Sequence, residues 1–476
     1  MHIVIIGGGP GGYEAALVAA EHGADVTLVS REGLGGNSVL WDCVPSKALI
    51  VSAEAMGWLQ SAHRLGVRAS RTEADGAQPE ADLATRAEID LAAVMDRIRA
   101  LGEDQSADIG KKVAAAGVRI VTGHARLSGR QTVEIEHDDA DTEVVPADVV
   151  LVATGSRPRI LPFSQPDRER VFTARELFDL RVLPERLVVV GSGATGAEYA
   201  GAFAAFGADV HLVSSRDQIL PSEDPDAAAV IEEVFERRGM TIHRRRRAVD
   251  MERGSDGVRI KIGAPDGAQE WLEASHALYC VGQVPASERL GLQAAGVQLG
   301  ERGAVPVDGV SRTNVPTIYA AGDVTGRMML ASVAAMQGRN AMWHALGQAV
   351  APLRWESVAA CIFTDPEVAT VGMTAEEAET AQMPVETTTL AFTGNPRAKM
   401  GEWTDGFCKV HAMAGSGTVL GACVVAARAS DLIHPLSVAV HNRLTVSQLA
   451  HAFSIYPSMS GSVQETARLL MGRLGE

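Results

Sequence analysis

A glycine pattern near the start of the chain fits the chemistry of binding a dinucleotide pyrophosphate. A short apolar strand is expected at 2–6, followed by the letters GGGPGG and an alanine-rich helix at 13–22. In this Gly-x-Gly-x-x-Gly turn, Gly7 would permit the turn, Gly9 would let the backbone approach the pyrophosphate, and Gly12 would allow close helix–strand packing. The start of the helix would then present free N–H groups and its positive dipole end to the phosphates. We therefore predict a dinucleotide site.

The same unit recurs about 180 residues further along the chain. Gly191, Gly193 and Gly196 lie between an expected strand at 186–190 and an expected helix at 197–206. A single glycine pattern is weak evidence, but two of them, each between a strand and a helix, indicate two dinucleotide-binding units. The sequence therefore predicts two nucleotide-containing cofactors.

The residue that usually binds the adenosine ribose is not acidic in either unit. Ser30 ends the second strand of the first unit, and Ser214 ends that of the second. An uncharged Ser214 would not repel a 2′-phosphate, and Arg216 would offer it a cation. We expect the second unit to accept a dinucleotide with a 2′-phosphate as well as one without it. In the first unit Glu32 is a possible substitute for the missing acid.

Composition excludes several classes of function. The chain has 476 residues, and the formal net charge, from 43 basic and 59 acidic residues, is −16. An acidic protein repels nucleic-acid backbones and anionic lipid surfaces. No apolar run approaches the ~18 residues of a membrane span, and the N-terminus has no signal-peptide pattern. Five scattered cysteines indicate reduced thiols. We expect a cytoplasmic protein with no nucleic-acid partner, no integral membrane segment and no metal site.

The elements that would position these motifs predict an α/β fold. A strand at 149–152 leads into the letters ATGSRP, and a buried strand within 313–323 ends at Asp323. A polar loop is expected at 68–88, before a long helix near 89–115, and the basic run at 244–247 is expected to be a solvated edge. The last part of the chain has the pattern of a separate α+β domain. Its strands are expected near 358–363, 368–371, 386–392 and 407–425, and its helices near 429–441 and 445–451.

On these motifs the chain resembles the flavoprotein disulfide reductase family, the group of dihydrolipoamide dehydrogenase, glutathione reductase and soluble transhydrogenase. The resemblance rests on GGGPGG, VPSK, ATGSRP, GSGATGAE, YAAGD, FTDPE and YPS, and it extends over essentially the whole chain. It implies two Rossmann-like domains and a C-terminal dimerisation domain. Residues 1–157 and 283–350 would bind FAD, residues 158–282 would bind NADH or NADPH, and residues 351–476 would form the interface of a homodimer.

The resemblance also assigns roles to single residues. Lys47 would lie near flavin N5 and pair with Glu198, because a lysine cation stabilises the anionic reduced flavin and a carboxylate keeps that cation charged. The alternative is that the two are unrelated surface groups. Asp323 would bind the ribitol side of FAD. Further cofactor-binding positions implied by the resemblance are Ala125, Thr154, Gly155, Leu330 and Ala331.

The sequence departs from the family where the disulfide chemistry is performed. The family uses two cysteines five positions apart, but here Ser38 occupies the first position and only Cys43 remains. A serine cannot form a disulfide. The family's His-Pro and Glu, delivered by the partner subunit, correspond to Tyr456, Pro457 and Gly461. A phenol, with an ordinary pKa of about 10, cannot replace imidazole as a proton shuttle near neutral pH, and the nearby His451 is expected to be an ordinary helix-end residue.

These losses predict that reduced flavin must pass its electrons directly to an acceptor. The candidates are a quinone, a second nicotinamide or dioxygen, and the chain is similar to NAD(P)H-quinone reductases that lack the cysteine pair. We predict a flavoprotein NAD(P)H:quinone oxidoreductase in which Tyr456 of the other subunit donates a hydrogen bond to a quinone carbonyl. The alternatives are a soluble transhydrogenase, a disulfide reductase and a flavin-holding scaffold. Cys43 is either a small buried side chain or a low-pKa nucleophile that cycles through a sulfenic acid.

Overall fold

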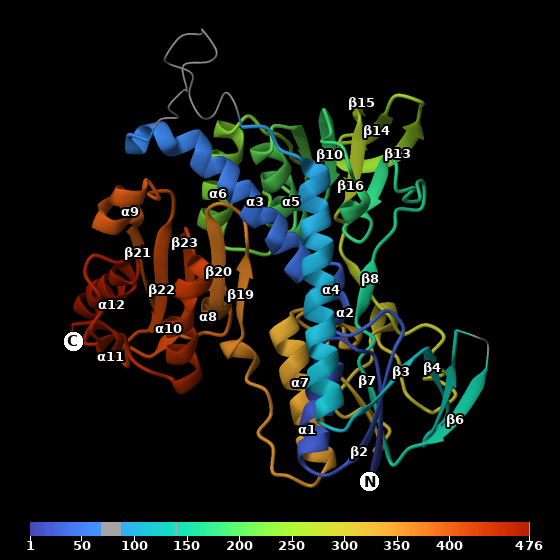
Figure 1. The fold of residues 1–476 in the computed structure, drawn as a ribbon. Helices are drawn as coiled ribbons and strands as arrows, with labels where there is room; N and C mark the ends of the chain where they lie inside the picture. Colours follow the sequence, from blue (N-terminus) through green and yellow to red (C-terminus); the bar gives the residue numbers. More distant parts are fainter. Residues whose placement is uncertain (68–86, 139–140, 476) are drawn as a thin grey trace.

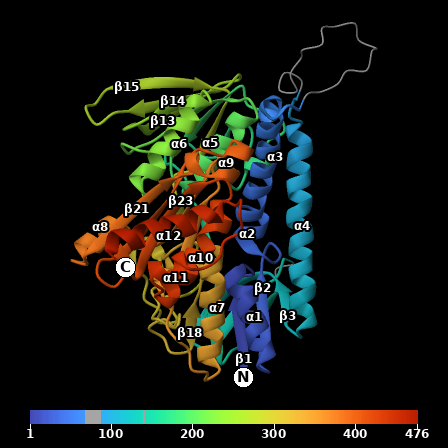
Figure 2. The same ribbon diagram turned by 90° about the vertical axis from the view of Figure 1, so that its left-hand side faces the viewer.

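The computed structural model describes residues 1–67, 87–138 and 141–475, and it contains three units, each built on a five-stranded sheet (Figure 1). The loop predicted at 68–88 lies outside the described residues except for its last two positions. In Figure 1 the C-terminal unit lies beside the two others, and the long helices α3 (Cys43–Ser61) and α4 (Leu91–Ala115) pack against each other. Figure 2 shows these two helices packed along one side of the molecule.

The first unit is a parallel sheet assembled from two distant parts of the chain. Its strand order is β18-β7-β1-β2-β3, so β18 completes a sheet whose other strands come from the N-terminal third. The strands are continuous apolar runs because a parallel sheet covered by helices is buried on both faces. Their bounds are β1 (His2–Ile6), β2 (Asp25–Ser30), β3 (Arg119–Thr122), β7 (Val149–Val152) and β18 (Ile318–Ala320).

Two helices of this unit cross at very short range. They are α1 (Pro10–Glu21) and α7 (Ala331–Ala345). A Cβ added to Gly338 would lie 2.1 Å from the carbonyl oxygen of Gly11, so only glycine permits this approach. The crossing fixes the N-termini of both helices relative to the sheet, and these N-termini are where the predicted FAD residues lie.

The second unit repeats the design of the first. Its parallel sheet has the order β12-β11-β10-β16-β9, and α5 (Ala194–Ala205) follows β10 as α1 follows β1. The helix begins three residues earlier than the predicted 197–206, because the glycine turn itself enters the helix. The other bounds are β9 (Val171–Thr173), β10 (Arg186–Val190), β11 (Asp209–Val213), β12 (Thr241–His243), β16 (His276–Tyr279) and α6 (Pro225–Arg237).

The third unit is an antiparallel sheet of order β19-β20-β23-β22-β21, flanked by helices. The single strand predicted near 407–425 is wrong: a turn in which Gly415 and Gly417 have positive φ divides it into a hairpin of β22 and β23. The strands are β19 (Ala359–Ile362), β20 (Glu367–Gly372), β21 (Val385–Ala391), β22 (Phe407–Met413) and β23 (Val419–Ala426). The helices are α8 (Ala375–Thr380), α9 (Pro396–Gly401), α10 (Ala429–Asn442), α11 (Val446–Ala450) and α12 (Ser460–Leu474).

Several smaller elements were not predicted. Two three-stranded antiparallel sheets extend the first and second units, and the short strands β8 and β17 pair where the chain passes between the two units. The strand predicted within 313–323 is shorter than expected. The bounds are β4 (His124–Gly129), β5 (Thr132–Glu136), β6 (Thr142–Pro146), β8 (Ser156–Pro158), β13 (Arg247–Arg253), β14 (Val258–Gly263), β15 (Gln269–Ala274), β17 (Gln283–Pro285) and α2 (Gly36–Leu40).

One hydrophobic cluster joins all three units around α3. It contains Leu49 of α3, Met95 of α4 and Phe203 of α5 together with Val368 and Val425 of the C-terminal sheet. The predicted fold class, two Rossmann-like units plus a C-terminal α+β unit, is confirmed. Of the helices in the described residues, none combines the length and the apolar character that a membrane crossing needs.

Candidate functional site

The first glycine turn leaves the start of α1 open to an anion. Gly9 is the N-cap, and no side chain of the described residues caps the helix. A Cβ on Gly12 would lie 1.8 Å from the carbonyl oxygen of Gly7, which explains why the third glycine is needed for helix and strand to pack. The uncapped amides and the helix dipole suit a pyrophosphate.

A second helix start and a loop complete this side of the site. Leu330 is the N-cap of α7 and Ala331 its first residue, and again no described side chain caps the helix. After β7, the Thr154 hydroxyl donates to the carbonyl of Ala286 at 2.7 Å, and Gly155 adopts a φ of +69°. These contacts set the path by which the chain leaves the sheet.

Ala125 and Asp323 have different surroundings. Ala125 is buried in β4, within the core of the first unit. Asp323 follows Gly322, which has a φ of +79°, and its Oδ2 accepts a hydrogen bond from the Ser156 hydroxyl at 2.7 Å. Burial raises the pKa of the Asp323 carboxyl. A partly buried carboxylate beside open helix starts can accept hydrogen bonds from the hydroxyl groups of a bound dinucleotide, so Asp323 fits FAD.

The Glu32 carboxylate forms an ion pair with Arg175 of the second unit. Both of its carboxylate oxygens accept from Arg175 at 2.6 Å, and the Trp41 indole donates to it at 3.2 Å. Burial alone would raise its pKa, but hydrogen bonds and charge from Arg175, supported by Arg31, hold the pKa of Glu32 below its usual range. Ser30 instead donates to the carbonyl of Gly33 within its own turn. The proposed substitute for an acid at Ser30 is therefore engaged in a contact between the two units.

Lys47 and Glu198 form a partly buried ion pair between α3 and α5. The Lys47 ammonium donates to both carboxylate oxygens, at 2.8 and 3.1 Å, and the Glu198 side chain is 5% exposed. Burial opposes charge on Lys47, but the Glu198 carboxylate outweighs this and raises the pKa of the lysine. The two residues are therefore not unrelated surface groups.

Sequence reasoning missed a third member of this cluster, Phe363, which follows β19. Its backbone N–H donates to Glu198 Oε1 at 2.9 Å, and the Lys47 ammonium lies 4.6 Å from the centroid of its ring. The residue opens the FTDPE motif, so its place in that motif was the only available signal. The cluster around the ion pair thus contains a residue from each of the three units.

The segment before Lys47 contains one thiol rather than two. Ser38, in α2, donates to the carbonyl of Gly35 at 2.9 Å, and Cys43 is the first residue of α3. Burial raises the pKa of the Cys43 thiol to about 11, and the neighbouring Asp42 adds to this. Such a thiol is protonated near neutral pH, which favours the small buried side chain over the low-pKa nucleophile.

Asp42 is a further residue that sequence reasoning did not single out. It is the N-cap of α3, but its side chain makes no cap hydrogen bond within the described residues. Burial raises the pKa of Asp42, with the Lys47 ammonium opposing this effect and Glu198 and Asp323 reinforcing it. A carboxylate directly before Cys43 in the sequence was the signal that could have identified it.

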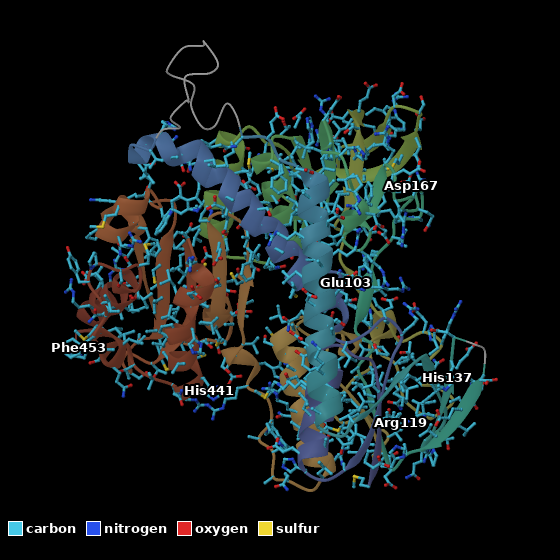
Figure 3. The ribbon with its side chains drawn as sticks, viewed as in Figure 1. Glu103, Arg119, His137, Asp167, His441 and Phe453 are labelled. Carbon is cyan, nitrogen blue, oxygen red and sulfur yellow. The ribbon has the colours of Figure 1, made fainter. Side chains whose placement is uncertain are left out.

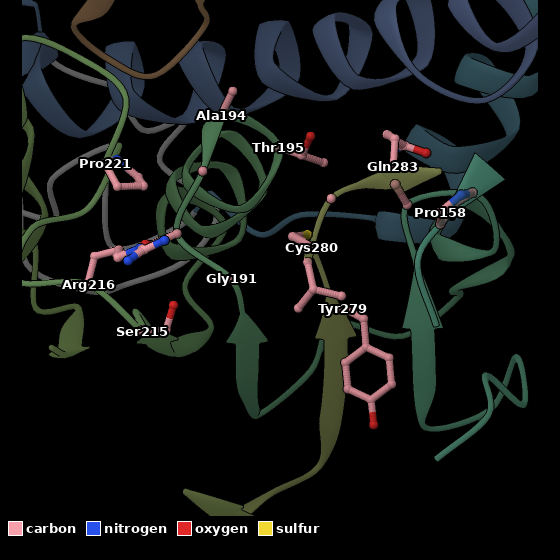
Figure 4. A pocket seen from close by; sticks show the side chains of 15 residues that line it. Pro158, Gly191, Ala194, Thr195, Ser215, Arg216, Pro221, Tyr279, Cys280 and Gln283 are labelled. Carbon is pink, nitrogen blue, oxygen red and sulfur yellow. The ribbon is translucent and has the colours of Figure 1, made fainter. Parts of the chain in front are cut away.

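A cavity of about 290 Å³ opens beside the second glycine turn (Figure 4). Gly193 is the N-cap of α5 without a capping side chain among the described residues, and a Cβ on Gly196 would lie 1.8 Å from the carbonyl of Gly191. Figure 4 shows Ser215 and Arg216 at one end of the cavity and Pro158 and Gln283 at the other. Its remaining lining residues are Ala174, Gly191, Ser192, Gly193, Ala194, Thr195, Pro221, Tyr279, Cys280, Val281 and Gly282.

Ser214 is hydrogen-bonded within the turn that follows β11. It is fully buried, it accepts a hydrogen bond from the Ser192 hydroxyl at 2.8 Å, and its own hydroxyl is directed to the carbonyls of Arg216 and Gln218 at 3.2 Å. The hydroxyl is engaged within the turn because a small polar residue there satisfies the local backbone. Ser214 therefore shapes the turn, while Ser215 and Arg216 line the cavity.

The basic run at 244–247 adjoins this turn, because the backbone N–H of Arg246 donates to the carbonyl of Ser214 at 2.8 Å. Arg244 donates to Glu232 and Glu236 at 2.8 and 2.9 Å, and Arg245 lies 3.2 Å from Asp217. These ion pairs, most of them partly exposed, agree with the prediction of a solvated edge.

Tyr456 lies apart from the other predicted catalytic residues. Its side chain is 83% exposed, and it shares a loop with Phe453, which is fully exposed, and Ile455, which is 79% exposed. Figure 3 shows Phe453 at the outer margin of the C-terminal unit. Three large exposed side chains on one loop suit contact with a second chain.

Comparisons with known proteins agree with the geometry. Residues 1–338 match the family model described as pyridine nucleotide-disulphide oxidoreductase, and residues 358–467 match its dimerisation domain. The chain is 45% identical over 478 aligned residues to an NAD(P)H dehydrogenase (quinone) of Mycobacterium tuberculosis, covering 98% of this chain and 94% of that protein. It is 34% identical to a dihydrolipoyl dehydrogenase of Haloferax volcanii, covering 99% and 96% of the two chains.

Solved structures show the same architecture. The crystal structure of LpdA from Mycobacterium tuberculosis matches with a TM-score of 0.91 and 44% identity, covering 99% of this chain and 100% of that chain. The HOCl-induced flavoprotein disulfide reductase RclA from Escherichia coli matches with a TM-score of 0.84 and 23% identity, covering 99% and 100%, which supports the fold alone.

Proposed function

The chain belongs to the pyridine nucleotide-disulphide oxidoreductase family, and from this premise we propose that it is an FAD-dependent NAD(P)H:quinone oxidoreductase. One observation carries the proposal: the Lys47–Glu198 pair is intact, while the position of the first family cysteine holds Ser38. The route for electrons into the protein is retained, and the dithiol that would lead them out is lost. The name of the 45% identical relative, an NAD(P)H dehydrogenase (quinone), supports the same acceptor.

The residues that would hold the two cofactors follow from the geometry above. The open N-termini of α1 and α7, together with Asp323, suit FAD, and the cavity beside Gly193 and Arg216 suits NADH or NADPH. We assign residues 1–157 and 283–350 to FAD and residues 158–282 to the nicotinamide nucleotide. Bound FAD would supply a hydride acceptor and a two-electron carrier.

The chain's own residues would prepare and protect that carrier. Lys47, kept charged by Glu198, would stabilise negative charge on the reduced cofactor. The protonated Cys43 thiol would contribute packing rather than nucleophilic chemistry. With Ser38 in place of the second thiol no disulfide can form there, and a planar quinone would accept electrons from the flavin directly.

We assign residues 351–476 to a homodimer interface, in agreement with the match to a dimerisation domain. The exposed side chains of Phe453, Ile455 and Tyr456 would become buried against the second copy. Tyr456 would then donate a hydrogen bond to a quinone carbonyl as charge develops there. The five cysteines are free thiols, which suits a cytoplasmic enzyme.

An acceptor panel tests the proposal. Purified holoenzyme would be assayed with NADPH against menadione, lipoamide, glutathione disulfide and an oxidised nicotinamide analogue. We expect turnover with menadione and little with either disulfide. Turnover with the nicotinamide analogue alone would identify a transhydrogenase instead.

Tyr456→Phe tests the partner hydrogen bond. It should lower menadione turnover about tenfold, the effect of losing one hydrogen bond to a charged group, while the rate of flavin reduction by NADPH stays unchanged and serves as the internal control. Wild-type menadione turnover in the variant would remove this role for Tyr456.

A further inference from the structure

The carboxylate of Glu198 is fixed by two elements at once. Its Oε1 accepts from the Lys47 ammonium at 3.1 Å and from the Phe363 N–H at 2.9 Å, while Oε2 accepts from the ammonium at 2.8 Å. Because one oxygen is shared, the carboxylate cannot rotate without breaking a hydrogen bond to Lys47 or to the C-terminal unit. The side chain is 5% exposed, so water does not replace a lost donor easily.

The ring of Phe363 is a second group in contact with the Lys47 ammonium. The ammonium lies 4.6 Å from the ring centroid, within the range at which an aromatic face attracts a cation. The carboxylate and the ring therefore contact the ammonium from two sides and restrict its movement.

We propose that Phe363 is a positioning residue for Lys47: its N–H sets the orientation of Glu198 and its ring holds the ammonium, so that the C-terminal unit determines where the positive charge of the site is directed. The inference rests on the proposed function only in that Lys47 serves bound FAD. Phe363, which lies outside both cofactor-binding units, would then affect the reduction of the bound flavin by NADPH. Docking of the C-terminal unit and acceptance of hydride are then coupled through one side chain.

The test uses holoenzyme and two variants of Phe363. Phe363→Leu removes the ring but keeps the N–H, and Phe363→Tyr keeps both. The readouts are the midpoint potential of the bound flavin and the rate constant of its reduction by NADPH in stopped flow. A cation–π contact of this kind corresponds to a change of about 2- to 30-fold. We expect Phe363→Leu to slow reduction by a factor in that range and to make the potential more negative, while Phe363→Tyr stays within about twofold of wild type.

Two controls separate positioning from general damage. Phe392→Leu changes a fully buried phenylalanine of the same unit and should lower thermal stability without altering the potential. In a Lys47→Met background, Phe363→Leu should have no further effect on the rate. Equal losses in both backgrounds, a wild-type potential in Phe363→Leu, or an equal change of potential in Phe392→Leu would overturn the inference.

These measurements involve only NADPH and the bound flavin. A failure of quinone turnover would therefore refute the proposed acceptor and leave the role of Phe363 standing. A wild-type response of Phe363→Leu in an enzyme that reduces quinones would do the reverse.

Discussion

Alkylation of Cys43 tests whether the remaining thiol takes part in the chemistry. Burial raises its pKa to about 11, against 9.0 for an ordinary thiol on the same scale. At pH 8 about 0.1% of such a thiol is thiolate, compared with roughly 10% of the ordinary one, so thiolate-dependent reactions should be about 100-fold slower. Limited access of the reagent would slow the reaction further, and for this reason the dependence on pH is more informative than the absolute rate.

The assay is iodoacetamide labelling of holoenzyme between pH 6.5 and 9.5, with the modified cysteine identified by mass spectrometry. We expect the Cys43 rate to rise about tenfold per pH unit over the whole range without a plateau. Cys43→Ser should retain most menadione turnover. A plateau near pH 7, together with an inactive serine variant, would refute the reasoning and favour the sulfenic-acid mechanism.

Three further predictions concern specificity and stability. Arg216→Ala should raise the KM for NADPH about tenfold or more, because it removes a charged contact to the 2′-phosphate. The KM for NADH should stay within a few-fold of wild type. Equal changes of both KM values would contradict this role of Arg216. Burial lowers the pKa of His411 from 6.5 to about 4, so acid protonates this histidine in the unfolded chain before it does so in the folded one. The stabilisation that the neutral His411 provides is therefore complete above pH 6.5 and is lost as the pH falls to 4. The free energy of unfolding should decrease by about 3 kcal/mol over this range. His411→Gln should remove that part of the acid dependence in urea unfolding, whereas the exposed His451→Gln should keep it; a wild-type slope in His411→Gln would contradict the assignment. Lys409 of the third unit forms an ion pair with Asp224 of the second unit at 2.7 Å. Lys409→Met should lower the free energy of unfolding by about 3 kcal/mol, because it leaves the Asp224 carboxylate without its cation. An unchanged thermal midpoint would show that the pair contributes little.

The parts of the site that depend on backbone chemistry were predictable from the sequence. A turn in which a Cβ on Gly12 or Gly196 would collide with a carbonyl oxygen leaves no other residue type possible, so the pattern itself identifies both dinucleotide turns. The strands that follow from continuous apolar runs, such as 149–152 and 186–190, were predicted with the observed bounds.

Contacts between distant segments were not predictable. The hydroxyl of Ser214 is oriented by its hydrogen bonds with Ser192 and the turn carbonyls, and no local pattern shows this. Glu32 finds Arg175 in another unit, and Phe363 meets the ion pair through a backbone N–H that exists in every residue type except proline. The hairpin between β22 and β23 was missed because the segments on either side of the Gly415-Ser416-Gly417 turn are largely apolar and together resemble one strand.

In the proposed mechanism electrons leave the flavin for the acceptor without passing through sulfur. Holoenzyme reduced anaerobically with one equivalent of NADPH would be mixed in a stopped-flow instrument with menadione or with lipoamide, and the return of oxidised-flavin absorbance would be recorded. We predict that menadione restores the absorbance at least about 100-fold faster than lipoamide, because the lipoamide disulfide finds no dithiol with which to exchange; this ratio corresponds to about 2.7 kcal/mol in activation free energy. Rapid reoxidation by lipoamide, or a purified protein that carries no flavin, would contradict the account.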